Sequence, residues 1–256
     1  MKYLDRFKSK KSILSLGKSF FENHRIIIVI LSLALLIRGI YYIEIVNSPC
    51  VVLHQWDQSD MNFFHTWAGK IAKGEVLTNS SFHPFHEWHN QVAEKYLFSE
   101  QSSNEKNTTK AGNAAKRNLW IKWYGGKRFH QEPLYPYFIA IIYKIFGFHI
   151  EWVFLLQLVL GLMNILLMYR ITKHFFGKSI AIVTALLITF SAPILFYEMV
   201  LLRTTCISFF SLLLVWLLVR VLKNESLFSW GKFGIVLGFA IVLKSVFLLL
   251  FIGLLG

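Results

Sequence analysis

The stretch that decides the fold is IIIVILSLALLIRGIYYIEIV at residues 26–46, in which Arg38 and Glu44 are the only charged residues. A helix that crosses a lipid bilayer needs about 20 mostly apolar residues, so this stretch predicts a spanning helix. Residues 1–25 form a basic tail in front of it, and Asp5 and Glu22 are its only acidic residues. Its basic residues are Lys2, Arg6, Lys8, Lys10, Lys11, Lys18 and Arg25. Basic segments beside a spanning helix stay in the cytoplasm, so we expect a cytoplasmic N-terminus and an uncleaved first helix that runs outward.

Four more apolar segments have the length of a spanning helix: residues 150–169, 179–197, 201–221 and 233–254. Basic residues lie in the two connections that would then face the cytoplasm. They are Arg170, Lys173 and Lys178 in the first connection, and Arg220, Lys223 and Lys232 in the second. The sequence therefore predicts an all-α integral membrane protein of about five spanning helices, with four of them in residues 150–256.

A sixth apolar segment, PLYPYFIAIIYKIFGF at residues 133–148, has a helical part too short to span. If it crossed the bilayer, every later helix would reverse and the basic connections would face outward. Its Tyr and Phe side chains are typical of the headgroup boundary, so we expect an interfacial or re-entrant helix. Residues 47–149 then form one large extracytoplasmic loop subdomain.

Composition agrees with a membrane protein and argues against a nucleic-acid-binding domain. Hydrophobic residues make up 55% of the chain and the mean hydropathy is +0.50, well above a soluble domain. The formal net charge is +13, but much of it lies in the tail and in the predicted cytoplasmic connections. The two cysteines, Cys50 and Cys206, do not indicate a disulfide framework.

Most of the polar chemistry lies in the loop, beginning with WDQSD at residues 56–60. Residues 60–73 predict an amphipathic helix that ends before Gly74, and we expect its apolar face to lie on the membrane. The side chains on that face are Phe64, Trp67, Ala68 and Ile71, with Asp60 at the start. A second helix is predicted at about 84–99, and residues 100–118 are polar enough for a mobile excursion. Asp60 is placed to accept a proton from an incoming hydroxyl or amine, although Asp60 or Ser59 also suits a helix cap.

The motifs around the first predicted helix resemble one family. W-D-x-S-D-x-x-x-F-x-x-W-A-x-x-I-A-x-G at residues 56–74 and FHQEPLYPYF at 129–138 resemble membrane glycosyltransferases of the C-type fold. The resemblance is to the branch of protein O-mannosyltransferases and aminoarabinose transferases. Residues 157–177 and 196–205 resemble its next helices, so the likeness spans about residues 26–250. Family members continue through further spanning helices, so the chain is expected to be an N-terminal portion.

This resemblance implies transfer of a sugar, with inversion, from a polyprenyl-phosphate donor to a lipid, glycan or protein acceptor outside the cytoplasm. It implies that Asp60 is the general base, because Asp60 has the family's offsets to Phe64 and Ala68; Asp57 is the competing carboxylate. The implied location is a bacterial inner or plasma membrane, with the catalytic loop extracytoplasmic. No nucleic-acid partner is expected.

The donor phosphate needs basic side chains near the membrane face. The candidates for contact with the donor or acceptor are Lys127, Arg128, His130, Glu132, Tyr135, Arg203 and Lys244. Charge within a spanning segment is costly and commonly functional, which singles out Lys244, whereas Arg38 is expected to extend toward the outer headgroups. Glu198 lies in the predicted second outer loop, where some C-type transferases hold a divalent metal. No second acid stands beside it, so a pair with Arg203 is an equal alternative.

The motif H-x-x-H-x-x-H, formed by His83, His86 and His89, gives a weak case for a metal, since no further ligand completes a site. No cofactor is therefore assigned, and a divalent metal stays possible. Two other functions remain open: a truncated, non-catalytic membrane scaffold, and a transporter subunit. Transporters usually concentrate their polar groups at the bilayer midplane, whereas this chain concentrates them in one outer loop.

Overall fold

The computed structural model describes residues 25–77, 87–103, 112–124, 129–223 and 225–255, and these are helical without any strand. Three helices are long and apolar enough to cross a membrane: the N-terminal helix Arg25–Val46, α6 (Ile150–Phe176) and α9 (Thr204–Lys223). A fourth span is formed if α7 (Lys178–Thr189) and α8 (Ala192–Glu198), which are bent by 58°, are taken together. The all-α membrane fold is thereby confirmed.

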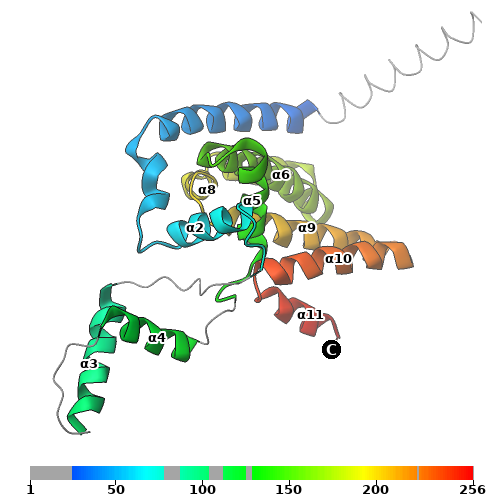
Figure 1. The fold of residues 1–256 in the computed structure, drawn as a ribbon. Coiled ribbons are helices and arrows are strands. Elements are labelled where there is room, and N and C mark those ends of the chain that lie inside the picture. The colour runs from blue at the N-terminus through cyan, green and yellow to red at the C-terminus, as the bar shows by residue number, and fades with distance from the viewer. Residues whose placement is uncertain (1–24, 78–86, 104–111, 125–128, 224, 256) are drawn as a thin grey trace, which may run out of the picture.

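Helix α6 is the central element of the bundle (Figure 1). Its first half packs against α5, and its second half packs against α7 and the N-terminal helix. Small side chains allow that second packing: Ala34, Ala181 and Ala185 are fully buried where the three helices meet. The side chains of Ile27 and Ile30 pack in the same cluster as Ile165 and Tyr169, so the start of the N-terminal helix lies beside the end of α6.

The basic ends of the helices gather at one end of the bundle. Lys223 at the end of α9 has its Nζ 3.4 Å from His174 Nδ1 near the end of α6. Arg25, at the start of the N-terminal helix, belongs to the same end because Ile27 packs near Tyr169. This arrangement agrees with the helix directions expected from the charge pattern, while the side of the membrane on which this end lies stays a prediction.

The last predicted span, residues 233–254, differs in the structure. Helix α10 (Leu227–Leu243) begins six residues earlier and ends before Lys244, and α11 (Phe247–Leu255) folds back beneath it (Figure 1). Phe233, Leu237 and Ala240 of α10 pack against α9. At the break, residues 244–246, the backbone N–H of Ser245 donates a hydrogen bond to the carboxylate of Glu132. Glu132 lies 113 residues earlier in the sequence.

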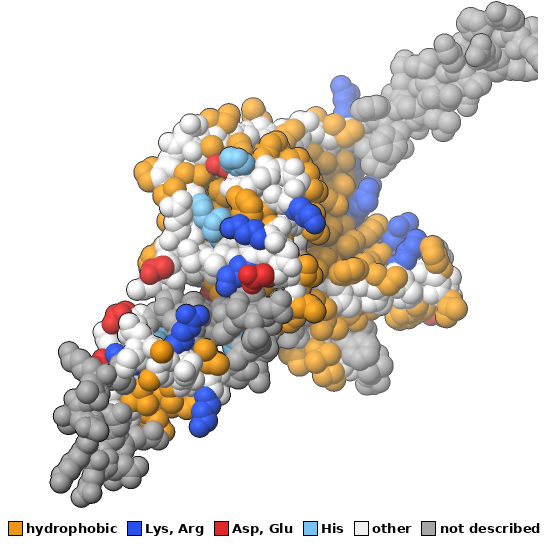
Figure 2. Space-filling model, viewed as in Figure 1, with side chains coloured by type: hydrophobic (Ala, Val, Ile, Leu, Met, Phe, Trp, Pro, Cys, Tyr) orange, Lys and Arg blue, Asp and Glu red, His pale blue; other side chains and the backbone are white. Residues whose placement is uncertain are grey.

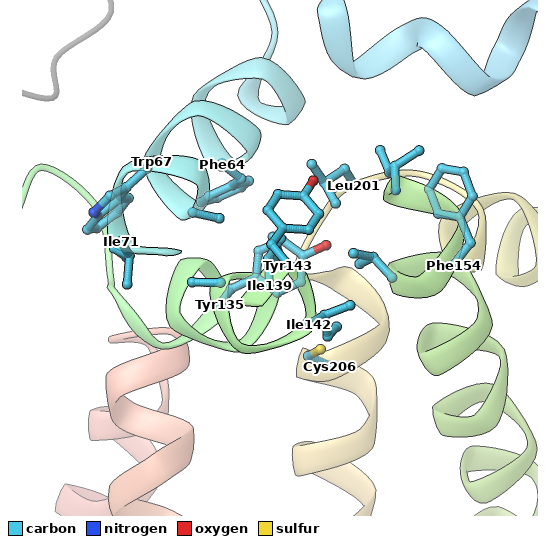
Figure 3. Packing of buried hydrophobic residues seen from close by; sticks show 14 of the residues in the cluster. Phe64, Trp67, Ile71, Tyr135, Ile139, Ile142, Tyr143, Phe154, Leu201 and Cys206 are labelled. Carbon is cyan, nitrogen blue, oxygen red and sulfur yellow. The ribbon is translucent and has the colours of Figure 1, made fainter. Parts of the chain in front are cut away.

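Helices α2 (Asp60–Ala72) and α5 (Leu134–Phe146) form a layer across the end of the bundle opposite the basic ends (Figure 3). The buried face of α2 contains the four predicted side chains Phe64, Trp67, Ala68 and Ile71, together with Phe63. That face packs on α5 rather than on lipid, which corrects the expectation of a membrane-lying helix. Helix α5 is itself apolar, and its buried Tyr135, Ile139 and Tyr143 form the protein surface on which α2 packs instead of lipid.

Between α2 and α5 the chain makes a hairpin of α3 (Glu87–Ser103) and α4 (Asn113–Tyr124), which pack against each other (Figure 1). Helix α4 occupies part of the segment predicted to be a polar excursion. It forms because Trp120 is buried against α3, where its indole N–H donates to the carbonyl of His89 at 2.8 Å. A short 3-10 helix, η1 (Pro49–Gln55), connects the N-terminal helix to α2.

Candidate functional site

Helix α2 begins with an exposed carboxylate. The Ser59 side chain caps the helix by accepting a hydrogen bond from the Asn62 N–H at 3.1 Å, which satisfies one of the free amides of the first turn. Because Ser59 performs the capping, the Asp60 side chain is not needed for it and lies exposed at the first helical position. Asp57, three residues earlier in the turn, is exposed as well. Either carboxylate is accessible to a reacting hydroxyl.

A clamp of three polar residues joins three distant parts of the chain. Arg203, which directly precedes α9, donates from Nη1 to Glu132 Oε2 at 2.5 Å. The other carboxylate oxygen of Glu132 accepts from the backbone N–H and the Oγ of Ser245, at 2.9 and 2.8 Å. We refer to Glu132, Arg203 and Ser245 as the carboxylate clamp. It brings together the start of α5, the start of α9 and the break between α10 and α11.

The carboxylate clamp favours the ionised form of Glu132. Burial by itself raises the pKa of this carboxyl group, but the hydrogen bonds from Ser245 and the charge of Arg203 outweigh burial and lower the pKa to about 2. Since one Glu132 oxygen is shared with Ser245, Arg203 is held by a single hydrogen bond in the described residues. Its other N–H groups have no hydrogen-bond partner among the residues that the structure describes.

Arg203 also contacts α2. The guanidinium carbon lies 5.6 Å from the centre of the Phe64 ring, within the range of a cation–π contact. Phe64 is one helical turn after Asp60, and residues four apart lie on the same side of a helix. The contact therefore places Arg203 beside the turn of α2 that follows Asp60.

A buried polar network lies beneath this surface. Arg38 Nη2 donates to Glu198 Oε1 at 2.8 Å, and both side chains are almost completely excluded from solvent. Gln157 Nε2 donates to the backbone carbonyls of Glu198 and Val200, at 3.0 and 2.9 Å, and Gln157 Oε1 accepts from the Tyr135 hydroxyl at 2.8 Å. The network ties the N-terminal helix, α5, α6 and the end of α8 together.

Two predictions for charged residues are corrected by this network. Arg38 does not extend toward the headgroups, since it is 0% exposed and paired with Glu198. Glu198 does not pair with Arg203, whose partner is Glu132. The buried charges of Arg38 and Glu198 neutralise each other, because an unpaired buried charge is very costly.

A pair of histidines for which no role was predicted adjoins α5. His65 Nδ1 lies 2.7 Å from the Tyr143 hydroxyl, and the rings of His54 and His65 are 4.7 Å apart. Burial lowers the pKa of both histidines, and for His65 the neighbouring His54 lowers it further. Their only sequence signal is the concentration of histidine in the loop, because Tyr143 is 78 residues from His65 along the chain.

The remaining candidates are dispersed or lie outside the described residues. Tyr135 is fully buried, so it supports Gln157 and does not face a substrate. Lys244 follows the last residue of α10 and is half-buried beside the carboxylate clamp, while His130 is half-buried two residues before Glu132. Lys127, Arg128, His83 and His86 lie outside the described residues. His89 is buried between Trp88 and Trp120.

The residues described do not contain a group of three or more His, Cys, Asp or Glu side chains that is suited to a metal ion. The candidate second outer-loop ligand, Glu198, has one carboxylate oxygen on Arg38. The possible metal site therefore gains no support from the geometry of Glu198.

The space-filling view shows how these groups are presented. Charged and histidine side chains gather over the part of the molecule that contains α2, whereas hydrophobic side chains cover α9 and α10 (Figure 2). Exposed apolar side chains along α10, such as Ile235 and Phe239, are expected of helices that face lipid. The polar face beside an apolar bundle suits a reaction between a membrane-bound and a water-exposed substrate.

Comparison with known families adds a specific finding. Residues 130–256 match the family model of dolichyl-phosphate-mannose-protein mannosyltransferases. The matched part contains Glu132, Glu198 and Arg203, while Asp57 and Asp60 precede it. Neither a curated protein nor a solved structure matches the chain. Together with the apolar helices, the family match indicates a multi-pass membrane protein and supports a mannosyltransferase-like glycosyltransferase.

Proposed function

We propose, taking the mannosyltransferase match of residues 130–256 as the premise, that this chain transfers a sugar from a polyprenyl-phosphate donor to an acceptor outside the cytoplasm. The observation that carries the proposal is the arrangement at α2. Asp60 is an exposed carboxylate at the start of this helix, and the Arg203 guanidinium contacts Phe64 one turn later.

The two groups suit the two halves of the reaction. A glycosyl phosphate leaves as an anion, and a positioned guanidinium stabilises the negative charge that develops on the phosphate oxygens. The acceptor hydroxyl attacks the anomeric carbon and loses its proton, which a carboxylate at hydrogen-bond distance takes up. In this scheme the sugar ring and the attacking hydroxyl lie between Asp60 and the phosphate that Arg203 binds.

The carboxylate clamp has a positioning role in this scheme. Glu132 fixes one edge of the Arg203 guanidinium, and Ser245 fixes Glu132, so the free edge of Arg203 is held toward the donor. A single displacement by the acceptor inverts the anomeric configuration. Because the acceptor approaches opposite the phosphate, the base and the cation are needed on opposite sides of the sugar.

The test is sugar transfer from a panel of radiolabelled polyprenyl-phosphate donors in membranes that contain the chain. Asp60→Asn is expected to lower kcat by about 100-fold or more, the usual contribution of a general base, with little change in the donor KM. Arg203→Gln is expected to raise the donor KM as well as lower kcat. Glu75→Gln, which alters an exposed carboxylate just after α2, is the matched control.

Each other outcome has a distinct meaning. Full activity of Asp60→Asn together with loss in Asp57→Asn would move the base to Asp57. Full activity in both variants would contradict both Asp57 and Asp60 as the base. The anomeric configuration of the product, determined by NMR, tests inversion separately, since a retained configuration would contradict single displacement.

A further inference from the structure

The hairpin of α3 and α4 has an exposed apolar face. Trp88, Val92 and Tyr96 follow one another at spacings of four residues, so they form one stripe along α3. Trp123 of α4 continues this stripe, because the centre of its ring lies 5.0 Å from that of Tyr96. Each of these four side chains is between 38% and 49% exposed. We refer to Trp88, Val92, Tyr96 and Trp123 as the aromatic face.

Buried rings support the aromatic face from below. Trp120 is buried, and the centre of its ring lies 5.6 Å from that of Trp88 and 5.0 Å from that of Trp123. The exposed rings are therefore held in place by the packing of the two helices. A contiguous apolar surface of this kind is typical of an interaction site, because water covers it at a cost in free energy.

Basic side chains border the aromatic face. Lys95 follows Trp88 by seven residues, or two helical turns, so it lies beside the same stripe of α3. Lys122 directly precedes Trp123 in α4. Both lysines are exposed, and the long lysine side chain carries its charge beyond the rings.

The acidic side chains of α3 are turned the other way. Glu94 is two residues after Val92 and Glu87 is five residues before it, so both carboxylates lie on the opposite side of the helix. Glu94 also accepts from Lys116 at 2.9 Å. The positive charge thus lies with the aromatic face and the negative charge of Glu87 and Glu94 lies behind it, an arrangement that is complementary to an anionic surface.

The position of the hairpin brings a membrane within reach. The hairpin lies at the end of the bundle that contains α2, to the side of α10 and α11 (Figure 1). Helix α3 runs across the direction of α9 and α10, as a helix does when it lies along a bilayer instead of through it (Figure 1). Hydrophobic and basic side chains are next to one another on the surface of the hairpin (Figure 2).

We propose that the aromatic face docks on the anionic lipid surface of the membrane that holds the bundle. Trp and Tyr rings are favoured at the level of the lipid headgroups, and lysine side chains beside them attract the lipid phosphates. The inference uses neither Asp60 nor the carboxylate clamp, so it does not rest on the proposed transferase reaction.

The experiment measures which side of the hairpin contacts lipid, in vesicles that contain the full chain. In a Cys50→Ser background, in which Cys206 is buried, a fluorescent maleimide is attached at Val92→Cys or at Ala114→Cys. Ala114 is exposed and lies nine residues before Trp123, or two and a half turns, so it is on the opposite side of α4.

The vesicles contain phosphatidylcholine alone or phosphatidylcholine with about one third phosphatidylglycerol. Each also contains a lipid with a nitroxide near the headgroup, which quenches a dye that contacts the bilayer, and iodide in solution quenches a dye that contacts water. With phosphatidylglycerol we expect the nitroxide to quench the dye at position 92 and iodide to quench the dye at position 114.

A matched pair of variants tests the charge. Lys122→Gln is expected to lower the ratio of docked to undocked hairpin about fivefold in the anionic vesicles, the contribution of one basic residue near an anionic surface. Arg117→Gln removes the same charge five residues earlier, on the far side of α4, and is expected to change the ratio less than about twofold. Neutral vesicles and high salt are expected to weaken docking in the same way as Lys122→Gln.

Three results would overturn the proposal. Equal nitroxide quenching at positions 92 and 114 would mean that the aromatic face does not select the bilayer. Quenching at position 92 that is the same in neutral vesicles, anionic vesicles and Lys122→Gln would exclude anionic lipid as the partner. Protection from both iodide and nitroxide would show that protein, such as a second copy of this chain, covers the face.

Discussion

Gly161 on α6 lies directly against the Glu198 carboxylate, so its replacement by alanine tests whether the buried ion pair determines the stability of the bundle. A Cβ atom at position 161 would lie 2.0 Å from Glu198 Oε1 and 2.4 Å from its Cδ. Carbon and oxygen atoms in contact are normally more than 3 Å apart, so the carboxylate has to move by more than 1 Å. The 2.8 Å hydrogen bond from Arg38 cannot survive that displacement.

The expected loss of stability follows from the burial of the pair. Arg38 and Glu198 are 0% exposed, and breaking a buried ion pair costs roughly 3–5 kcal/mol. The carboxylate is the end of a flexible side chain, so we expect the lower limit, about 3 kcal/mol. For a protein of this size that corresponds to a fall in Tm of about 6–12 °C.

The buried thiol of Cys206 provides the assay. Cys206 lies in α9 and is 5% exposed, whereas Cys50 is exposed, and both are free. In a Cys50→Ser background, a thiol-reactive maleimide dye in detergent reports the unfolding of α9 as the temperature rises. Gly39→Ala is the matched control, because Gly39 adjoins Arg38 and a Cβ there meets nothing within 4 Å. The control is expected to change stability by less than about 1 kcal/mol.

A double-mutant cycle isolates the carboxylate. When Arg38→Met and Glu198→Ala remove the pair, Gly161→Ala is expected to cost less than about 1 kcal/mol, since both the oxygen and the Cδ that it displaces are gone. A Tm for Gly161→Ala within about 2 °C of that for Gly39→Ala would refute the reasoning. It would mean that the ion pair adjusts without loss.

Three further predictions concern the other polar contacts. The pKa of Glu132 is lowered to about 2, so its ionised form stabilises the fold by up to about 3 kcal/mol above pH 4.5, and this contribution is lost as the pH falls toward 2. Infrared titration against Glu132→Gln checks the pKa, and Ser245→Ala is expected to raise the pKa of Glu132. Gln157→Leu leaves two buried carbonyls and a phenolic hydroxyl without a partner, so it is expected to lower stability by about 3 kcal/mol or more in the Cys206 assay. Wild-type stability of this variant would show that water replaces the amide. Lys116→Met, which removes a 2.9 Å pair with the partly exposed Glu94, is expected to cost less than about 1 kcal/mol, and a larger loss would show that the hairpin depends on this pair.

The sequence predicted the helices better than it predicted their neighbours. The spacing of Phe64, Trp67, Ala68 and Ile71 defined the apolar face of α2 correctly, because helical period depends only on positions along the chain. It did not indicate what covers that face, since lipid and another apolar helix are equivalent for a hydrophobic side chain. The protein surface that covers it is α5, which begins 62 residues after α2 ends.

The candidate site was predicted in part for the same reason. Asp60 follows a capping serine at a helix start, a local pattern that is visible in the sequence, and the structure places the carboxylate in solvent as that pattern requires. Its role as a base stays a prediction. The partner of Arg203 was not visible, because several carboxylates have the right charge and only the packing of α5 beside α9 brings Glu132 to 2.5 Å.

The sequence by itself determined that the chain forms apolar helices able to cross a membrane, and where most of them lie. Lipid cannot hydrogen-bond a peptide group, so each spanning segment has to satisfy its backbone within itself, and that requirement is met by residues close together in the chain. Tertiary structure alone decided the break after α10 and the pairing of Arg38 with Glu198 across 160 residues. These depend on which helices pack together, because a buried charge or a free carbonyl is stabilised only by the group that packing brings within hydrogen-bond distance.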